Sequence, residues 1–158
     1  MYVGIDPGKS GAIAVLDDSG KILDVIDMPC QTIGSRVFPD GAAIAQVISK
    51  SRHACIELVS SRPGQGVVSV FTFGQGFGGV VTLCSALVDD VQLESPQAWQ
   101  KHFKLRKKKG EKSLSKQQIA DRCLALYPDA PLYGPRGGLK DGRSDAILIA
   151  RFLYDQKQ

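Results

Sequence analysis

The chain has 158 residues, 43% of them hydrophobic and 23% charged, which suffices for one well-packed domain and excludes a disordered or fibrous protein. The formal net charge is +4, but residues 101–116 alone hold eight basic residues against one acid, whereas the rest of the chain has more acids than bases. This local excess predicts contact with a polyanion, and we expect residues 1–158 to form a single domain.

The residue order predicts neither a targeting segment nor a membrane segment. Asp6 and Pro7 fall where the apolar core of a signal peptide would have to lie, and no uninterrupted apolar run reaches 18 residues. We therefore expect a cytoplasmic protein with no membrane partner, and an organelle is the alternative location.

The cysteines and histidines limit the chemistry that is available. The cysteines are isolated, without a Cys-x-x-Cys pair for zinc or redox work, which indicates small apolar side chains in a reducing compartment. The four are Cys30, Cys55, Cys84 and Cys123. With only His53 and His102, a histidine-rich metal site or a Ser-His-Asp triad is difficult to assemble, so any metal must be held mainly by oxygen.

The first part of the chain predicts three strands, a helix and a further strand. Short β-prone runs cover residues 2–6, 11–16 and 21–28, with turn-forming residues between them, which predicts an antiparallel meander. Helical spacing of apolar residues follows within 40–50, and the apolar run 54–59 is short enough to be a buried strand.

The remainder predicts mainly helices. Residues 64–87 are glycine-rich and then apolar, which predicts a helix over the second half of that segment, and 88–94 can supply a fifth strand. Ser95-Pro96 is typical of a helix start and opens a short helix that carries Trp99. The basic segment is then expected to be a loop, followed by helices over 114–127 and 141–154 with a Pro- and Gly-rich connection between them.

Two acids lie on predicted strands where a structural role is difficult to assign. Asp6 ends the first apolar strand and Glu57 lies inside a later one, where burying an ionised carboxylate is costly unless something compensates it. Asp6 could instead form an Asx turn with the following Pro-Gly, and Glu57 could be exposed on a half-buried strand. From either residue alone, both interpretations stay open.

Two further acids lie on the last predicted helix. At about 100° per residue, Asp141 and Asp145 fall on the same side as Leu148, Ile149 and Phe152, so the acids face the core. An alternative is that Asp141 is an N-cap and that both acids favour the positive end of the helix dipole, which explains Asp141 better than Asp145.

Convergence of the four carboxylates predicts a site for a divalent metal. They can meet only if the two strands are neighbours and the helix packs over their ends. Mg²⁺, or Mn²⁺ in its place, prefers such oxygen ligands, and two ions about 3.5–4 Å apart can activate a water and stabilise the departing oxygen of a phosphodiester. No small-molecule cofactor is expected.

Three motifs resemble those of RuvC-type Holliday junction resolvases, in the RNase H-like superfamily. They are Gly-Ile-Asp-Pro-Gly at 4–8 with Gly11, Ile56-Glu57 before a glycine-containing loop, and Asp-Gly-Arg-Ser-Asp-Ala at 141–146. The segment 96–101 and Lys116 also lie where the family has its intervening elements, so the resemblance covers nearly the whole chain. The bacterial pattern spaces its last two acids three residues apart rather than four, which favours a viral or organellar branch and leaves open whether Asp141 is a direct ligand.

The resemblance implies an α/β fold of the RNase H-like type, a mixed five-stranded sheet with its first three strands antiparallel and helices on both faces. It implies that Asp6, Glu57, Asp141 and Asp145 are catalytic metal ligands. It also implies a homodimer, joined through the apolar segment 67–87, in which each site nicks one strand of a four-way DNA junction.

Candidate DNA contacts lie in the loop after Glu57, at the aromatic residues that follow it, and in the basic segment. Phe71 and Phe73 could stack on bases at an opened junction or could belong to the core, and the core interpretation is favoured for Phe73. The lysines could meet phosphates or could simply be solvated. The predicted contacts are Ser60, Ser61, Arg62, Gln65, Phe71, Lys101, Lys107, Lys108, Lys109, Lys112 and Lys116.

Three competing hypotheses remain from the sequence. One is a nucleic-acid-binding module with this fold but no cleavage activity, and another is an RNA-processing nuclease of the same superfamily. The third follows from Gly-Ile-Asp-Pro-Gly-Lys-Ser-Gly, which also resembles the first phosphate loop of sugar kinases and actin-like ATPases. Those proteins need a second domain to close over ATP, for which this chain is too short.

Overall fold

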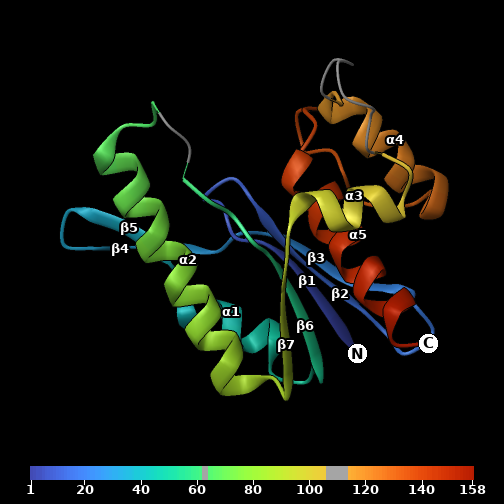
Figure 1. Ribbon diagram of the computed structural model, residues 1–158, viewed down its shortest axis with the longest axis horizontal. Helices are drawn as coiled ribbons and strands as arrows, with labels where there is room; N and C mark the ends of the chain where they lie inside the picture. The colour runs from blue at the N-terminus through green and yellow to red at the C-terminus, as the bar shows by residue number, and fades with distance from the viewer. Residues whose placement is uncertain (62–63, 106–113) are drawn as a thin grey trace.

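A computed structural model describes residues 1–61, 64–105 and 114–158. Its main sheet has five strands in the order β3-β2-β1-β6-β7, and a separate pair, β4 and β5, forms a hairpin beside it (Figure 1). The strands are β1 (Tyr2–Asp6), β2 (Ala12–Leu16), β3 (Ile22–Asp27), β4 (Cys30–Ile33), β5 (Arg36–Pro39), β6 (His53–Glu57) and β7 (Asp90–Glu94). The helices in the described residues are α1 (Gly41–Ile48), α2 (Val67–Leu87), α3 (Pro96–His102), α4 (Lys116–Leu126) and α5 (Asp141–Gln156).

The central strand β1 pairs antiparallel with β2 and parallel with β6, which confirms the predicted mixed sheet. β2 continues antiparallel to β3, so the predicted meander is also confirmed. In the parallel pair, Ile5 lies opposite Ile56, so β1 and β6 end at the same edge of the sheet. Asp6 and Glu57, the next residue of each strand, therefore lie side by side at that edge.

Helices cover both faces of the sheet, as predicted (Figure 1). Alternate strand residues point to opposite faces, and Val3 and Ile5 pack with Ile44 of α1 and Val80 of α2 on one face. The other face holds a second core in which the strands pack against α5, with α3 and α4 flanking it. Burial of Leu148, Ile149 and Phe152 in this second core confirms the predicted inner face of α5.

Two glycines allow α5 to lie directly on the sheet. A Cβ atom on Gly4 would lie 2.2 Å from the carbonyl oxygen of Ala146, so no side chain fits between β1 and the helix. A Cβ atom on Gly142 would lie 2.6 Å from the carbonyl oxygen of Ser10, in the turn between β1 and β2. These contacts fix the first turns of α5 against the end of β1, where Asp6 is located.

The structure adds a hairpin and a longer helix to the predicted elements, and it corrects one prediction about a side chain. The β4–β5 hairpin falls in residues 30–39, which carried no predicted strand, and its pairing is antiparallel throughout. The helix expected over the second half of 64–87 begins at Val67 and continues to Leu87, so its glycines lie within the helix. Phe73 is 37% exposed and Phe71 is 57% exposed, so the core interpretation of Phe73 was wrong.

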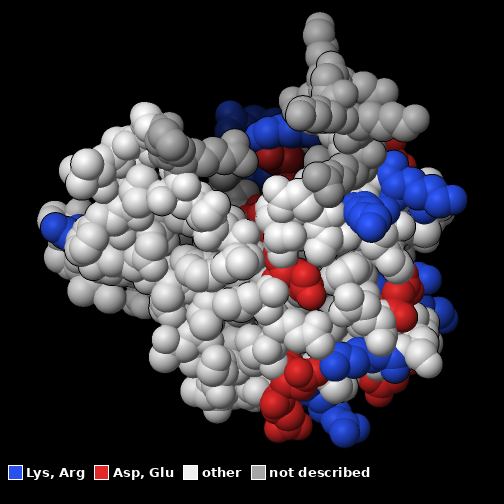
Figure 2. Space-filling view, viewed as in Figure 1, with Lys and Arg blue, Asp and Glu red and all other residues white. Residues whose placement is uncertain are grey.

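Helix α2 is unusual because it contains no charged residue and yet is largely exposed. Among the described residues it is the one helix long and apolar enough to cross a membrane, a test based on length and composition that the core helices of soluble proteins also pass. Figure 2 shows that the part of the molecule formed by α2 and the hairpin carries almost no charged side chains on the visible face. A long exposed apolar surface of this kind is typical of a protein interface.

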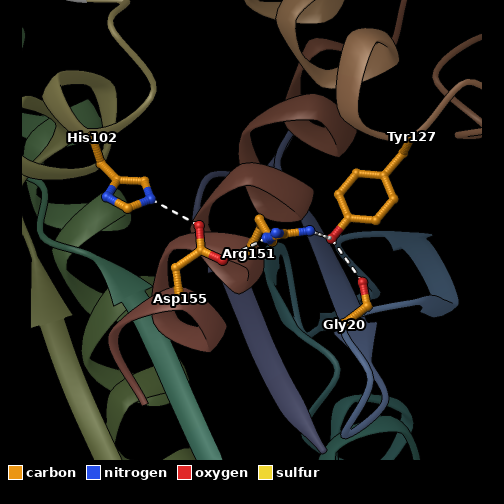
Figure 3. A network of polar contacts seen from close by, with 5 residues as sticks. All are labelled: Gly20, His102, Tyr127, Arg151 and Asp155. Atoms are coloured by element: carbon orange, nitrogen blue, oxygen red, sulfur yellow. Dashed lines mark hydrogen bonds and ion pairs between the residues drawn. The ribbon is translucent and has the colours of Figure 1, made fainter. Parts of the chain in front are cut away.

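A polar network fastens the far end of α5 to its neighbours (Figure 3). Arg151 Nε donates to Asp155 Oδ1 over 2.6 Å, and His102 Nε2 of α3 lies 2.8 Å from the other oxygen of that carboxylate. The Tyr127 hydroxyl accepts from Arg151 Nη1 over 3.4 Å and donates to the carbonyl of Gly20 over 2.8 Å. The carboxyl-terminal half of α5 is thereby tied to α3, to the end of α4 and to the β2–β3 turn, well away from the acids on its first turns.

Candidate active site

The structure brings the four predicted carboxylates into one electrostatic cluster. Asp6 and Glu57 end the neighbouring strands β1 and β6, and the first turns of α5 carry Asp141 and Asp145 over the same edge. The charges of Asp6, Glu57 and Asp141 all raise the pKa of Asp145. Like charges raise the pKa of a carboxyl mainly at short range, so this effect agrees with the position of the four acids at one edge of the sheet, given by β1, β6 and the first turns of α5.

Asp145 is the most perturbed member of the cluster. Burial, followed by repulsion from Asp6, Glu57 and Asp141, raises the pKa of its carboxyl to about 8. Its Oδ1 atom is buried and has no hydrogen-bond partner. A buried carboxylate oxygen without a partner is costly, and a bound cation would compensate it.

Asp6 and Glu57 each receive a hydrogen bond that opposes the effect of burial on the pKa. Burial raises the pKa of Asp6, while the amide of Gly8 opposes this effect by donating to Oδ1 over 3.3 Å. Burial likewise raises the pKa of Glu57, and the indole N–H of Trp99 opposes it by donating to Oε1 over 3.0 Å. Each carboxylate is therefore oriented by one N–H group and keeps other oxygen lone pairs available.

Lys116 brings a positive charge to the acid cluster. Its Nζ lies 2.5 Å from Asp141 Oδ2, and this hydrogen bond raises the pKa of Lys116. Asp6 and Asp145 act on it in the same direction. Lys116 is the first residue of α4, which starts in a capping box formed by Ser115 and Gln118, so local hydrogen bonds fix the point at which the ammonium group enters the site.

The alternative interpretations of the acids can now be compared with the structure. Lys140, rather than Asp141, occupies the N-cap of α5, so the N-cap interpretation of Asp141 was wrong. Glu57 is half-buried and hydrogen-bonded, not simply exposed. The turn contact predicted for Asp6 is present, since Oδ1 accepts from Gly8, but it coexists with membership of the acid cluster.

The donor set fits a hard divalent cation in its chemistry, because it is made of carboxylates and includes the unpaired Oδ1 of Asp145. As the side chains stand, no three Asp, Glu, His or Cys residues in the described part of the chain are grouped closely enough to hold one ion. The assignment of metal ligands therefore stays a prediction. Cys55, Cys84 and Cys123 are buried as expected, whereas Cys30 is exposed.

Comparison with known proteins identifies the fold. Neither a protein-family model nor a curated protein matches the sequence. A structure of Thermus thermophilus RuvC in complex with a Holliday junction substrate matches with a TM-score of 0.60 and 14% identity, over 98% of this chain and 94% of that chain. The fold is that of RuvC. A second Thermus thermophilus RuvC structure matches with a TM-score of 0.59 and 16% identity, over 98% of this chain and 95% of that one.

The RuvC-like, RNase H-like fold confirms the predicted fold class, whereas the viral or organellar branch stays a prediction. A sequence identity this low does not transfer the activity of RuvC to this chain. The shared fold nevertheless allows the position of the acid cluster to be described within it. The cluster lies where β1, β6 and α5 meet, and these are the segments that carry the three motifs identified in the sequence.

The predicted DNA contacts fall in three places. The loop after β6 and the start of α2 enclose a cavity of about 600 Å³ whose lining includes Ser60, Ser61, Gln65 and Phe73. Phe71 lines a larger groove of about 770 Å³ between α2 and the hairpin, and Lys101 is exposed on α3. Lys116 lies beside Asp141, and the remaining predicted contacts, Arg62, Lys107, Lys108, Lys109 and Lys112, lie outside the described residues.

Two residues near the acids were not assigned a role in the sequence. Trp99 was noted only as part of a short helix, yet it is 1% exposed and holds Glu57. Glu94 ends β7 opposite Glu57, and burial, followed by the charges of Glu94 and Glu57, raises the pKa of the Cys55 thiol. An acid at the end of a parallel strand was a signal for Glu94, whereas nothing in the sequence indicated which acid Trp99 would contact.

Proposed function

We propose that the protein is a structure-specific DNA endonuclease that resolves Holliday junctions and other branched DNA by paired, divalent-metal-dependent hydrolysis. The observation that carries this proposal is the half-buried acid cluster with the buried, unpaired Asp145 Oδ1 atom, on a RuvC-like fold. We further propose that residues 1–158 act as a single nuclease domain and that the protein works in the cytoplasm.

Each residue of the cluster has a role that follows from its position. Mg²⁺ or Mn²⁺, as two ions held by Asp6, Glu57, Asp141 and Asp145, would supply an activated water and stabilise the leaving 3′ oxygen, giving 5′-phosphate and 3′-hydroxyl ends. Trp99 orients Glu57 through its N–H group. Lys116, now paired with Asp141, is placed to donate to a phosphate oxygen when DNA enters the site.

We propose that two copies associate through α2, so that two sites can nick opposite strands. The exposed side of α2 carries Gly74 and Gly78, one turn apart, and a Cβ atom at either would meet no atom within 4 Å. Small residues at this spacing allow two helices to approach closely. The exposed Val67, Val68 and Phe71 extend the apolar surface toward the hairpin.

We propose that the DNA lies across the carboxylate edge, between the loop after β6 and the basic segment. The cavity between the loop after β6 and the start of α2 is lined by hydroxyl, amide and aromatic groups, which suit an unstacked base. Lys101 and Lys116, with the predicted lysine contacts outside the described residues, would meet phosphates. The matching RuvC structure contains a Holliday junction substrate, which supports a four-way junction as the first DNA to test.

Cleavage assays with matched variants test this proposal. Purified protein is incubated with labelled four-way, flap and linear duplex DNA and with a hairpin RNA, in Mg²⁺ or in EDTA. We expect paired nicks across the junction in Mg²⁺ only, and loss of cleavage with retention of junction binding in Asp145→Asn. Asp129→Asn, an exposed Asp outside the cluster, serves as the matched control and should cleave normally.

Three outcomes would contradict the proposal in different ways. Junction binding without cleavage in Mg²⁺ or Mn²⁺ would identify a binding module, and cleavage of the RNA hairpin alone would identify an RNA-processing nuclease. Cleavage that survives in Asp145→Asn would place the active site elsewhere.

A further inference from the structure

Asp27, at the end of β3, forms ion pairs with two cationic side chains from the start of α5. Arg143 Nε donates to Asp27 Oδ1 over 2.7 Å, and Lys140 Nζ lies 3.2 Å from Asp27 Oδ2. Both oxygens of one carboxylate are thus used to hold residues that flank Asp141. The hydrogen bond from Arg143, the largest influence, lowers the pKa of Asp27, so its carboxylate stays charged at neutral pH.

Asp27 lies in the same cross-strand row as the acid cluster. Ala12 is paired with Asp6 on one side and with Asp27 on the other. Two strand spacings separate Asp6 from Asp27, which is about 10 Å. Asp27 is therefore too far along the row to share a ligand position with Asp6, but it is well placed to hold the helix that passes over the row.

The start of α5 needs such an external contact because it lacks a side-chain cap. Lys140 occupies the N-cap and makes no capping hydrogen bond through its side chain. Instead, the amide of Lys140 donates to the carbonyl of Leu132, and Arg143 Nη1 donates to the carbonyl of Pro131 over 2.8 Å. Arg143 thereby joins the helix, the preceding connection and Asp27.

The two sides of the first turn are held by different means. On one side, Gly142 packs against the backbone of Ser10, which sets how closely the helix approaches the sheet. On the other side, Arg143 and Lys140 are tied to Asp27, which sets the rotation of the turn about the helix axis. Asp141 and Asp145 project from this turn and the next, so a small rotation would move both carboxylates relative to Asp6.

We propose that Asp27 is a positioning residue that acts through Arg143 to hold the first turn of α5, and with it Asp141 and Asp145, in the arrangement that binds divalent metal. This inference rests on the proposed function and adds a determinant of metal affinity outside the ligand set. Asp27 is 46% exposed, and ion pairs at exposed positions contribute little to global stability. Its loss should therefore affect metal binding more than folding.

The test compares Asp27→Asn with Asp24→Asn, an exposed Asp on the same strand. Mn²⁺ binding to the DNA-free protein is measured by calorimetry, together with melting temperature and hydrogen exchange of the backbone amides. We expect Asp27→Asn to weaken Mn²⁺ binding by about tenfold, comparable with the loss of an outer-shell partner, and to speed exchange in residues 141–146 only. Asp24→Asn should match the wild type, and Asp27→Glu should recover most of the affinity.

The cleavage assay gives a second readout. In Asp27→Asn the Mg²⁺ concentration for half-maximal cleavage should rise by the same factor, with the rate at saturating Mg²⁺ changed less than the affinity. Unchanged Mn²⁺ affinity, or faster exchange spread over the whole chain, would overturn the positioning role. A wild type that neither binds Mn²⁺ nor cleaves would refute the proposed function, and exchange confined to the start of α5 in Asp27→Asn would then still show that Asp27 holds this turn.

Discussion

The indole N–H of Trp99 donates a hydrogen bond to the Glu57 carboxylate over 3.0 Å, which joins the short helix α3 to the end of strand β6. Trp99 is almost completely buried, so the same side chain fills the core and orients an acid of the candidate site. The contact makes the pKa of Glu57 depend on a residue 42 positions away in the sequence.

Replacing Trp99 with Phe should shift the pH dependence of cleavage. The hydrogen bond from Trp99 lowers the pKa of Glu57, so its loss leaves burial and the charge of Asp6 to raise that pKa further. Glu57 would then ionise at higher pH, and the rising limb of the rate profile should move in the alkaline direction. Rates measured from pH 5 to 9 at saturating Mg²⁺ check this; a uniform loss of rate at every pH would contradict it.

Replacing Asp145 with Asn should stabilise the folded protein in EDTA while abolishing cleavage. Because folding raises the pKa of Asp145 to about 8, the folded state favours the protonated form, and stability falls as the pH rises from the unfolded-state pKa near 3.8 toward 8. The variant lacks this loss. Its advantage in melting temperature should grow between pH 4 and pH 8 and level off above, at about 2–4 °C for each kcal/mol gained.

The matched Asp129→Asn variant should show no such pH-dependent advantage. Equal melting temperatures for Asp145→Asn and wild type across the whole pH range would mean that the Asp145 carboxylate is not destabilising. Adding Mg²⁺ should raise the melting temperature of the wild type and leave Asp145→Asn nearly unchanged, since a ligand stabilises only the protein that binds it.

Replacing Lys116 with Met should slow cleavage with little effect on folding. The ammonium group is exposed but pairs with Asp141, and it lowers the pKa of Asp145. Without it, a donor to the phosphate is lost, and we expect the rate to fall by about 10²–10³. Lys21→Met, in the β2–β3 turn, controls for the loss of one positive charge. Equal losses of junction affinity and rate would assign Lys116 to binding alone.

Replacing Gly78 with Leu should dissociate the proposed dimer. A side chain at Gly78 meets open space within one copy, and Leu favours the helix over Gly by roughly 1 kcal/mol, so the monomer should fold at least as well. Light scattering should then report a monomer, whereas Gly138→Leu, in the connection before α5, should leave the wild-type mass unchanged. A monomeric wild type, or a dimeric Gly78→Leu, would contradict association through this face.

The parts of the fold that depend on local signals were predictable from the sequence. The meander of β1, β2 and β3 follows from alternating β-prone runs and turns, and the inner face of α5 follows from the spacing of Leu148 and Ile149. The hairpin at 30–39 was missed because its short strands carry mixed exposure and no clear alternation. The start of α2 was misplaced because glycine is a poor helix former in isolation.

The contacts that make the site were less predictable, because they depend on how distant segments pack. The sequence showed Asp6 and Glu57 as acids on apolar strands. That the two lie side by side could be known only from the register of β1 against β6. The Lys116–Asp141 ion pair depends on where α4 lies relative to α5, and the link from Asp27 to Arg143 spans 116 positions. Sequence patterns indicate which residues carry chemistry, and tertiary packing decides which of them meet.

The seating of α5 on Gly4 has a consequence for synthesis in the cell. β1 leaves the ribosome before α5, yet each is the surface on which the other packs. A nascent chain that still lacks α5 exposes one face of its sheet. It has only two of the four acids of the cluster, Asp6 and Glu57. The proposed nuclease site can therefore be complete only after translation of α5, and a chain terminated before α5 would be an aggregation-prone fragment that lacks Asp141 and Asp145.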